Sequence, residues 1–355
     1  MKAFTYLFRA ALIGTVILTQ VGATPIKPQP YDVGLYLHPA RLVDFGGRRL
    51  NVVCTGKGSP TVILEAGLLA DSTTWRLVQP AVSRNTRVCS YDRAGLGFSD
   101  PANDARDADA IVSDLHALLQ KGEISAPYVL VGWSSGGPYT RLFQYTYSSE
   151  VVGLVEIDPD TEFATSTDYA KIVTSVMRKP LVWYDNQEQE WYRQFADCAK
   201  NVARGTCAFF PGAAAYLRAK GCPNPSNTEC AISEVRAKHL AQPSFWKDEM
   251  LELKSENKSH SEVRGAARPY GKLPLVVLTD SEEGDIDYSP GPISVAAQRA
   301  EWLAKNKAED RLARLSSVGA HFVVAGSHHA ILLDHPTAVI SAIEEVVDQA
   351  RYNRC

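Results

Sequence analysis

The prediction of the fold rests on the segment Tyr128-Val-Leu-Val-Gly132-Trp-Ser134-Ser-Gly-Gly137. An apolar run leads into a G-x-S-x-G motif, and a helical pattern follows at 139–145. In such a motif the serine stands on a sharp turn between a strand and a helix, where glycines let neighbouring backbones approach closely. Its hydroxyl is then exposed at a helix N-terminus, where the helix dipole favours developing negative charge. We therefore expect Ser134 to be a nucleophile.

Apolar, β-branched runs alternate with amphipathic stretches on both sides of this motif. The expected strands are 50–54, 61–65, 87–91, 128–131, 152–157, 275–278 and 321–325. The stretches 108–119 and 338–350 have apolar residues at helical spacing. Strands separated by helices require parallel crossovers, so the sequence predicts an α/β fold with a mostly parallel, helix-covered sheet.

The alternation stops between residues 160 and 267. This segment is helix-prone and carries the aromatic residues Trp183, Tyr184, Trp191, Tyr192, Phe195, Phe209, Phe210 and Trp246. We interpret 160–267 as a cap inserted into a core formed by 45–159 and 268–355. The alternative is a pair of linker helices with no role over a site. The aromatic content suggests an apolar or mid-sized substrate.

The N-terminus predicts export. Lys2 and Arg9 precede an apolar run at 10–21, and small residues follow just before Thr24. This pattern is typical of a secretory signal peptide at 1–23, and the apolar run is short for a bilayer span. A Pro-rich lead at 24–44 follows, with little regular structure expected up to about residue 40. We expect a secreted or periplasmic protein without stable membrane insertion after cleavage; an uncleaved anchor is the alternative.

The composition and the cysteine spacing argue against a nucleic-acid-binding protein and against a metal site. The chain has 355 residues, 45% hydrophobic and 22% charged, with a net charge of −3, which gives no basis for a nucleic-acid partner. None of its seven cysteines has metal-ligand spacing. We expect no metal or cofactor. We expect the cysteines to form structural disulfides, with one thiol left over; the sequence does not show which cysteines pair. The cysteines are Cys54, Cys89, Cys198, Cys207, Cys222, Cys230 and Cys355.

A serine nucleophile requires a base and an acid that orients it. The pair His328-His329 follows the last expected strand, at the edge where such a sheet binds ligands, whereas His321 begins that strand and is expected to be structural. Two carboxylates end neighbouring strands, Asp158 and Asp280. We favour Asp158, with Asp280 as the alternative.

The oxyanion of an acyl-transfer reaction is usually held by two backbone N–H groups. Ser135, next to the expected nucleophile, supplies one of them. The turn Glu65-Ala66-Gly67-Leu68 leaves the strand 61–65, and we assign the second N–H to Leu68. A plain glycine turn is the alternative interpretation.

With these residues in place, the sequence resembles the α/β-hydrolase fold family, in its serine hydrolase, esterase-like branch, from about residue 45 to the end outside the insertion. Besides 132–137, the segment Tyr91-Asp-Arg-Ala-Gly-Leu-Gly-Phe-Ser99 is similar to the family's D-x-R-G-x-G-x-S segment. The resemblance implies a cap after the sixth strand. It also implies His329 as the base, because in the family's C-terminal loop a proline commonly lies seven residues later, as Pro336 does here.

The resemblance also limits the chemistry. Epoxide hydrolases and haloalkane dehalogenases of this fold carry aspartate at the elbow, so the serine implies cleavage of an ester or a related acyl bond. The family's glycine-then-aspartate segment is absent after Leu278, which favours Asp158 as the acid. We expect an acyl-enzyme mechanism on a small-molecule acyl substrate. The alternatives are an aminopeptidase-like or C–C bond hydrolase, or a non-catalytic binding protein on the same scaffold.

Overall fold

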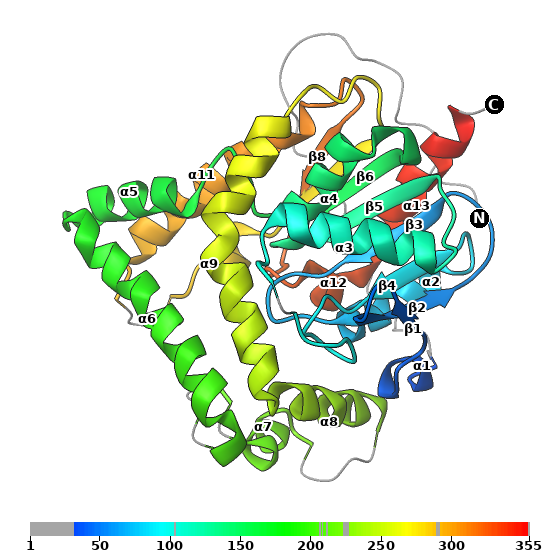
Figure 1. The fold of residues 1–355 in the computed structure, drawn as a ribbon. Helices are drawn as coiled ribbons and strands as arrows, with labels where there is room; N and C mark the ends of the chain where they lie inside the picture. The colour runs from blue at the N-terminus through cyan, green and yellow to red at the C-terminus, as the bar shows by residue number, and fades with distance from the viewer. Residues whose placement is uncertain are drawn as a thin grey trace.

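The computed structural model describes residues 32–353 except 103, 206, 208, 211, 223–226 and 289–291 (Figure 1). The expected signal peptide at 1–23 lies outside the described residues, as do the first part of the lead and Cys355.

A mostly parallel sheet of eight strands, in the order β1-β2-β4-β3-β5-β6-β7-β8, forms the centre of the molecule. Strands β3 to β8 run parallel to their neighbours, whereas β1 and β2 pair antiparallel and β2 joins β4 antiparallel. The bounds are β1 Leu42–Asp44, β2 Arg49–Thr55, β3 Thr61–Glu65, β4 Val88–Tyr91, β5 Tyr128–Trp133, β6 Val151–Ile157, β7 Leu275–Thr279 and β8 Ala320–Val323. The predicted α/β fold class is confirmed.

Helices cover both faces of this sheet (Figure 1). Helices α3 (Ala108–Lys121) and α4 (Gly136–Thr146) pack on one face, where residues such as Leu115 and Phe143 are fully buried against the strands. Helix α13 (Pro336–Tyr352) packs on the other face together with the short α2 (Gln79–Val82) and α12 (Ile331–Asp334). Apolar residues on both sides of the strands leave the carboxyl edge of the sheet as the place for polar chemistry.

A helical insertion follows β6 and ends before β7. It contains α5 (Ser166–Met177), α6 (Leu181–Asn201), α7 (Ala213–Ala219), α8 (Thr228–Leu240) and α9 (Pro243–Ala266). Helix α9 lies between α6 and the core, where it packs on α3 and α4 (Figure 1). After β7 come the short α10 (Glu282–Asp285) and the long α11 (Val295–Ala313), which packs against α5.

Phe195, Phe209, Phe210 and Trp246 belong to a hydrophobic core within the insertion. The rings of Phe195 and Phe209 pack against Trp246, and Phe195, Phe210 and Trp246 are at most 2% exposed. An insertion outside the main sheet must bury apolar surface of its own to be stable. The burial of these four residues is explained by the stability of the insertion, and the expectation of an apolar or mid-sized substrate stays a prediction.

One element of the N-terminal lead departs from expectation. Residues 34–37 form the helix α1 (Gly34–Leu37), although little regular structure is expected up to about residue 40. The strand β1 (Leu42–Asp44) follows beyond that point and is not among the expected strands. Tyr36 is buried at 1% exposure and its hydroxyl donates to the side chain of Gln79. This contact fixes the lead on the core, which a count of prolines does not reveal.

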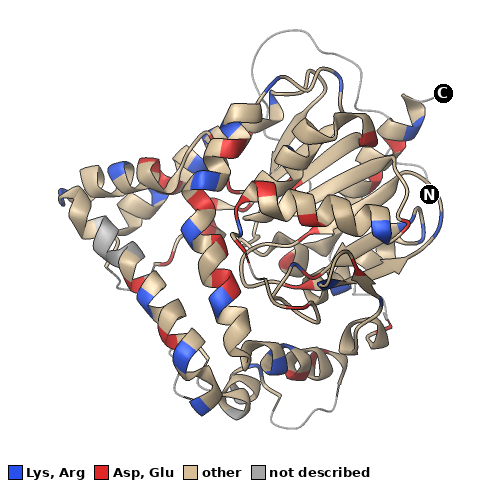
Figure 2. Cartoon of the chain, in the orientation of Figure 1, with Lys and Arg blue, Asp and Glu red and all other residues tan. Residues whose placement is uncertain are grey.

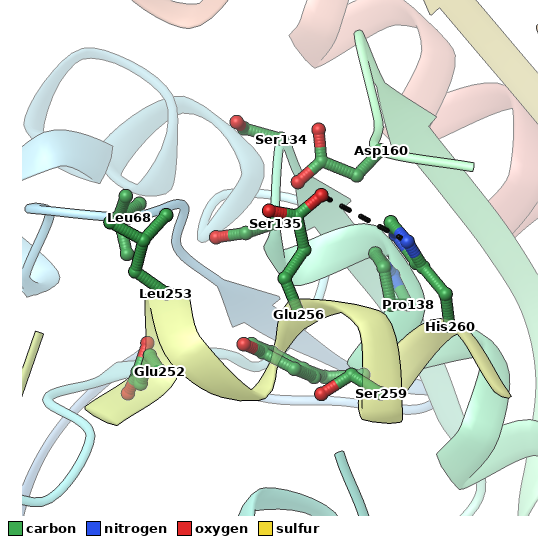
Figure 3. Close-up of a pocket in the computed structure, with 11 residues that line it drawn as sticks. Leu68, Ser134, Ser135, Pro138, Asp160, Glu252, Leu253, Glu256, Ser259 and His260 are labelled. Carbon is green, nitrogen blue, oxygen red and sulfur yellow. Dashed lines mark ion pairs between the residues drawn. The ribbon is translucent and has the colours of Figure 1, made fainter. Parts of the chain in front are cut away.

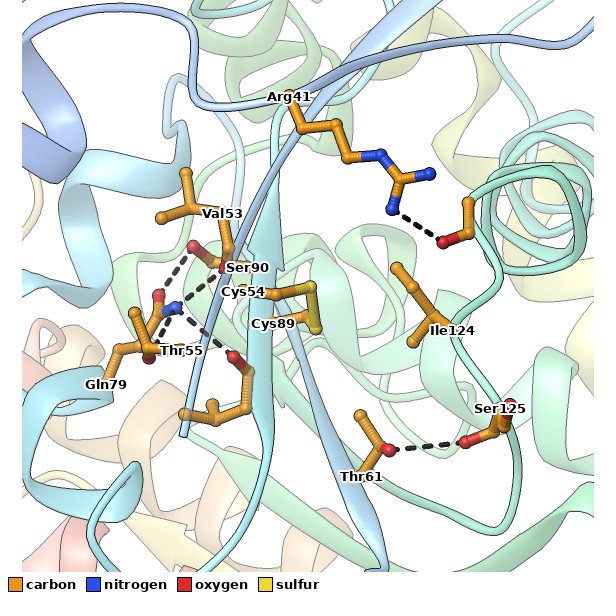
Figure 4. The surroundings of a disulfide bond; sticks show 12 residues. Arg41, Val53, Cys54, Thr55, Thr61, Gln79, Cys89, Ser90, Ile124 and Ser125 are labelled. Carbon is orange, nitrogen blue, oxygen red and sulfur yellow. Dashed lines mark hydrogen bonds between the residues drawn. A yellow bond between two sulfur atoms is a disulfide. The ribbon is translucent and has the colours of Figure 1, made fainter. Parts of the chain in front are cut away.

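Six of the seven cysteines form disulfides: Cys54–Cys89, Cys198–Cys207 and Cys222–Cys230. The first joins β2 to β4, whose antiparallel register places the two cysteines opposite each other. Figure 4 shows Gln79 beside this disulfide, where its amide donates to Val53 O and accepts from Ser90 Oγ. The other two bonds lie in the insertion. No helix of the described residues is long and apolar enough to cross a bilayer.

Replacing both Cys54 and Cys89 with alanine is expected to lower the free energy of unfolding by about 4 kcal/mol, because the bond closes a loop with a sequence separation of 35. Replacing Cys222 and Cys230, with a separation of 8, removes less loop entropy, about 2.5 kcal/mol. Urea unfolding of the oxidised proteins measures both. An equal or larger loss in the second variant would contradict the loop-entropy argument.

Candidate active site

Ser134 sits on the sharp turn between β5 and α4. Its φ of +55° is a left-handed conformation that costs energy for a residue with a side chain. Its N–H donates to Ile157 O at 3.1 Å, and its carbonyl accepts from Asp160 N at 3.0 Å, so the turn is tied to the end of β6. A Cβ on Gly67 would lie 2.9 Å from the Cβ of Ser134, which leaves only glycine at that position.

His329 lies between Ser134 and Asp158. Its Nε2 is 3.0 Å from Ser134 Oγ, and its Nδ1 is 2.5 Å from Asp158 Oδ2. The loop that carries His329 is held by the indole of Trp133, whose Nε1 donates to the His329 carbonyl at 3.0 Å. Asp158 is 2% exposed, whereas the imidazole side chain is 49% exposed and open to a ligand.

The competing acid Asp280 faces a different partner. Its Oδ1 accepts from Lys305 Nζ at 2.8 Å and from Trp302 Nε1 at 3.2 Å, both on α11. Its backbone N–H donates to Asp158 Oδ1 at 3.1 Å. Asp280 therefore positions Asp158 through its main chain, and its carboxylate makes no bond to the imidazole of His329.

The charges around the imidazole favour its protonated form. Removal from bulk water would lower the pKa of His329, but the hydrogen bond and the negative charge of Asp158 raise it above its usual value. Burial likewise would raise the pKa of Asp158, but His329 and Lys305 hold it below its usual value. Burial and the nearby Asp158 raise the pKa of Asp280 to about 7. Asp158 is thus the carboxyl group that stays ionised beside the imidazole.

The other histidines near this loop have separate partners. His328 is exposed, and its Nδ1 is 3.0 Å from Asp334 Oδ2. His321, on β8, has its Nε2 2.6 Å from Thr279 Oγ1. Only His329 of the three contacts Ser134.

The turn that carries Leu68 is anchored by buried charges. Arg93 donates to the carbonyls of Ala66 and Gly67, and it forms ion pairs with Glu65 on β3 and Glu252 on α9. The insertion also contributes at Leu69, where Glu249 accepts the N–H at 2.9 Å and Arg236 donates to the carbonyl at 3.1 Å. Helices α8 and α9 of the insertion thus help to set the position of this turn.

Two cavities meet at the Ser134–His329 contact. The first, of about 220 Å³, is lined by Leu68, Ser134, Ser135, Pro138, Tyr139, Asp160, Glu252, Leu253, Glu256, Ser259 and His260 (Figure 3). The second, of about 170 Å³, is lined by Asp158, Pro159, Asp160, Thr161, Ala164, Ser166, Tyr169, Glu256, His260, Lys305 and His329. None of the insertion aromatics Phe195, Phe209, Phe210 and Trp246 lines either cavity.

Several of these residues were absent from the sequence-based expectations. Lys305, Glu256 and His260 lie on long helices without a motif, so no local signal points to them. Asp160 could have been predicted to lie near the site, because it comes two residues after Asp158 at the same strand end. Within the described ranges, no group of three or more His, Cys, Asp and Glu side chains could hold a metal ion.

Comparison with known proteins places the chain in a family. Residues 62–342 match the model of the alpha/beta hydrolase family, and the chain belongs to this family. The uncharacterized protein YqjL of Bacillus subtilis is 32% identical over 104 residues, 29% of this chain and 41% of the relative. The first curated relatives are each matched over 41% of their length or less.

Solved structures agree on the fold. An esterase from Thermogutta terrifontis superposes with a TM-score of 0.57 at 18% identity, covering 87% of this chain and 98% of the esterase. A bromoperoxidase from Bacillus anthracis superposes with a TM-score of 0.54 at 15% identity, covering 87% and 99%. Because one of these structures is an esterase and the other a bromoperoxidase, the shared fold does not identify the reaction.

The pKa of His329 is expected to lie above the ordinary value of about 6.5 and to fall in Asp158→Asn, because the amide removes the neighbouring negative charge. Asp280→Asn is the matched control, since its side chain bonds to Lys305 and Trp302 instead. Histidine NMR titration, with the signal assigned through His329→Gln, measures both shifts. A larger fall in Asp280→Asn than in Asp158→Asn would contradict this arrangement.

Proposed function

We propose that the protein is an exported serine hydrolase that cleaves a carboxylic ester or a related acyl bond through an acyl-enzyme. The observation that carries the proposal is the 3.0 Å contact between Ser134 Oγ and His329 Nε2, with the other imidazole nitrogen on Asp158. A neutral imidazole at hydrogen-bond distance is the base that a serine hydroxyl needs to attack a carbonyl carbon.

In the proposed first half-reaction, His329 Nε2 takes the proton of Ser134 as Oγ bonds to the substrate carbonyl carbon. The backbone N–H groups of Ser135 and Leu68 hold the resulting oxyanion. The buried charge of Asp158 stabilises the imidazolium that forms. The imidazolium then gives its proton to the leaving group, which departs and leaves the acyl group on Ser134.

In the second half-reaction a water molecule takes the place of the leaving group. His329 accepts a proton from this water while the water oxygen attacks the acyl carbon. The imidazolium then gives that proton to Ser134 Oγ as the carboxylic acid leaves. The half-exposed imidazole is compatible with water reaching the acyl group. No cofactor is invoked in either half-reaction.

Export is part of the proposal. The basic and apolar N-terminal pattern at 1–23 supports it. The disulfides of the core and the insertion also favour an oxidising compartment. The substrate is proposed to be a small acyl compound, because the two cavities at Ser134 are small.

Asp158→Asn is expected to lower kcat/KM for short p-nitrophenyl esters by roughly 10³- to 10⁴-fold, because the neutral amide no longer orients the imidazole or stabilises its charged form. Asp280→Asn, a matched removal of one carboxylate from the adjacent strand end, is expected to cost less than about tenfold. Rates measured spectrophotometrically at several pH values distinguish them. The proposal fails if wild-type protein hydrolyses these esters no faster than Ser134→Ala.

A further inference from the structure

The proposed oxyanion site consists of two backbone N–H groups, those of Leu68 and Ser135. Both residues line the cavity beside Ser134 (Figure 3). Neither N–H donates a hydrogen bond to another part of the described chain, whereas the N–H groups of Ser134 and Leu69 both do. Two free donors beside a nucleophile suit an oxyanion only if each N–H points at it, so whatever sets their direction matters for the reaction.

The direction of the Leu68 N–H depends on the peptide group that joins Gly67 to Leu68. This peptide is trans, so its carbonyl and its N–H point in opposite directions. Arg93 donates to the Gly67 carbonyl at 2.9 Å and to the Ala66 carbonyl at 2.6 Å. Because Glu252 on α9 accepts from this guanidinium through both carboxylate oxygens, the insertion takes part in orienting the peptide.

The following residue, Leu69, is held by the insertion in a left-handed conformation, with φ of +58°. Its N–H donates to Glu249 Oε2 on α9 at 2.9 Å, and its carbonyl accepts from Arg236 Nη2 on α8 at 3.1 Å. The side chains of Leu68 and Leu69 also pack against the hydrophobic core of the insertion. A left-handed residue with a side chain persists only where its surroundings hold it, and here those surroundings belong to the insertion.

The two side chains that bind Leu69 are themselves held in place. Glu249 is 0% exposed, and Arg236 donates to Thr73 Oγ1 at 3.3 Å, just beyond the turn. Acidic residues recur along α9 where it lies beside the core (Figure 2). Glu249 and Glu252 are three residues apart on this helix, so they share one face of it. One face of α9 therefore acts on both peptide groups that flank Leu68.

We propose that Glu249 and Arg236 are positioning residues of the oxyanion site. They hold Leu69 in its left-handed conformation, and this keeps the preceding N–H, that of Leu68, directed at the oxygen of the reacting carbonyl. The oxyanion site is then complete only while α8 and α9 are docked on the turn. This inference rests on the proposed hydrolase function. Neither residue lines the two cavities, so both act through the backbone and not on the substrate.

Two measurements report on the oxyanion site. The first is kcat/KM for p-nitrophenyl acetate, which covers formation of the acyl-enzyme. The second is the inhibition constant of 1,1,1-trifluoro-2-butanone. The carbonyl carbon of this ketone bonds to Ser134 Oγ, the hydroxyl proton passes to His329, and the carbonyl oxygen becomes an oxyanion. Rates are expressed per active site, counted by exhaustive fluorophosphonate labelling, so a loss of folded protein enters neither number.

Glu249→Ala is expected to lower kcat/KM and raise the inhibition constant by a similar factor, roughly 10- to 100-fold, because a displaced N–H loses its hold on the oxyanion. Arg236→Met is expected to change both numbers in the same directions by about tenfold. Burial raises the pKa of Glu249 well above its usual value, which favours the neutral acid. Glu249→Gln should therefore stay within about threefold of wild type, because its amide oxygen can still accept the Leu69 N–H.

Glu262→Ala is the matched control. It removes another α9 carboxylate that accepts a backbone N–H of the core, that of Asp109 at 3.0 Å, but this contact lies at the start of α3 and not at the oxyanion turn. Both numbers are expected to stay within about threefold of wild type. A general loosening of α9 would instead affect this control and Glu249→Ala alike.

The outcomes separate this inference from the function on which it rests. If hydrolysis depends on Ser134 but Glu249→Ala and Arg236→Met match wild type, the positioning role is overturned and the hydrolase stands. An unchanged inhibition constant, or a loss in Glu249→Gln or Glu262→Ala as large as in Glu249→Ala, also overturns it. If circular dichroism shows that Glu249→Ala does not fold, Arg236→Met decides in the same way. If wild-type protein is no faster than Ser134→Ala, both proposals fall.

Discussion

The imidazole of His329 is held between a buried carboxylate and a serine hydroxyl, and the site depends on this arrangement. Asp158 can remain ionised at 2% exposure because His329, Lys305 and the backbone of Asp280 all donate to it. Each donor comes from a different part of the chain after β6. The sheet brings them together because β6 and β7 are parallel neighbours whose carboxyl ends meet.

The insertion is coupled to the core through buried charge as well as through apolar packing. The guanidinium of Arg93 joins the turn after β3 to Glu252 on α9, and Glu249 binds the next part of that turn. Breaking one partner of such a buried pair would leave an uncompensated charge, which is strongly destabilising. Helix α9 therefore has two roles: it braces the turn expected to hold the oxyanion, and it supplies acceptors to the cavities.

The fold could be predicted from the sequence because its signals are local: an apolar run ending in G-x-S-x-G, and alternating runs that the structure places within one or two residues of expectation. Ser134 is predicted from the same local motif, and His329 from the spacing to Pro336 that the family resemblance implies; the catalytic roles of both stay predictions. No local sequence signal decides whether Asp158 or Asp280 contacts His329, because both residues follow strands that end at the same edge of the sheet. Only the direction of each side chain distinguishes them, toward His329 for Asp158 and toward Lys305 for Asp280. The positions of Glu256 and His260 depend on how α9 docks on the core, which no sequence motif encodes. Aromatic residues such as Phe195 and Trp246 are buried within the insertion itself.

Covalent labelling with a fluorophosphonate, followed by mass spectrometry of the digested protein, tests the pairing of Ser134 and His329 most directly. Because the imidazole must activate the hydroxyl, we expect a single adduct on Ser134 and labelling at least about 100-fold slower in His329→Ala. Labelling that is absent from wild-type protein, that falls on Ser135, or that proceeds equally fast without the imidazole would contradict it.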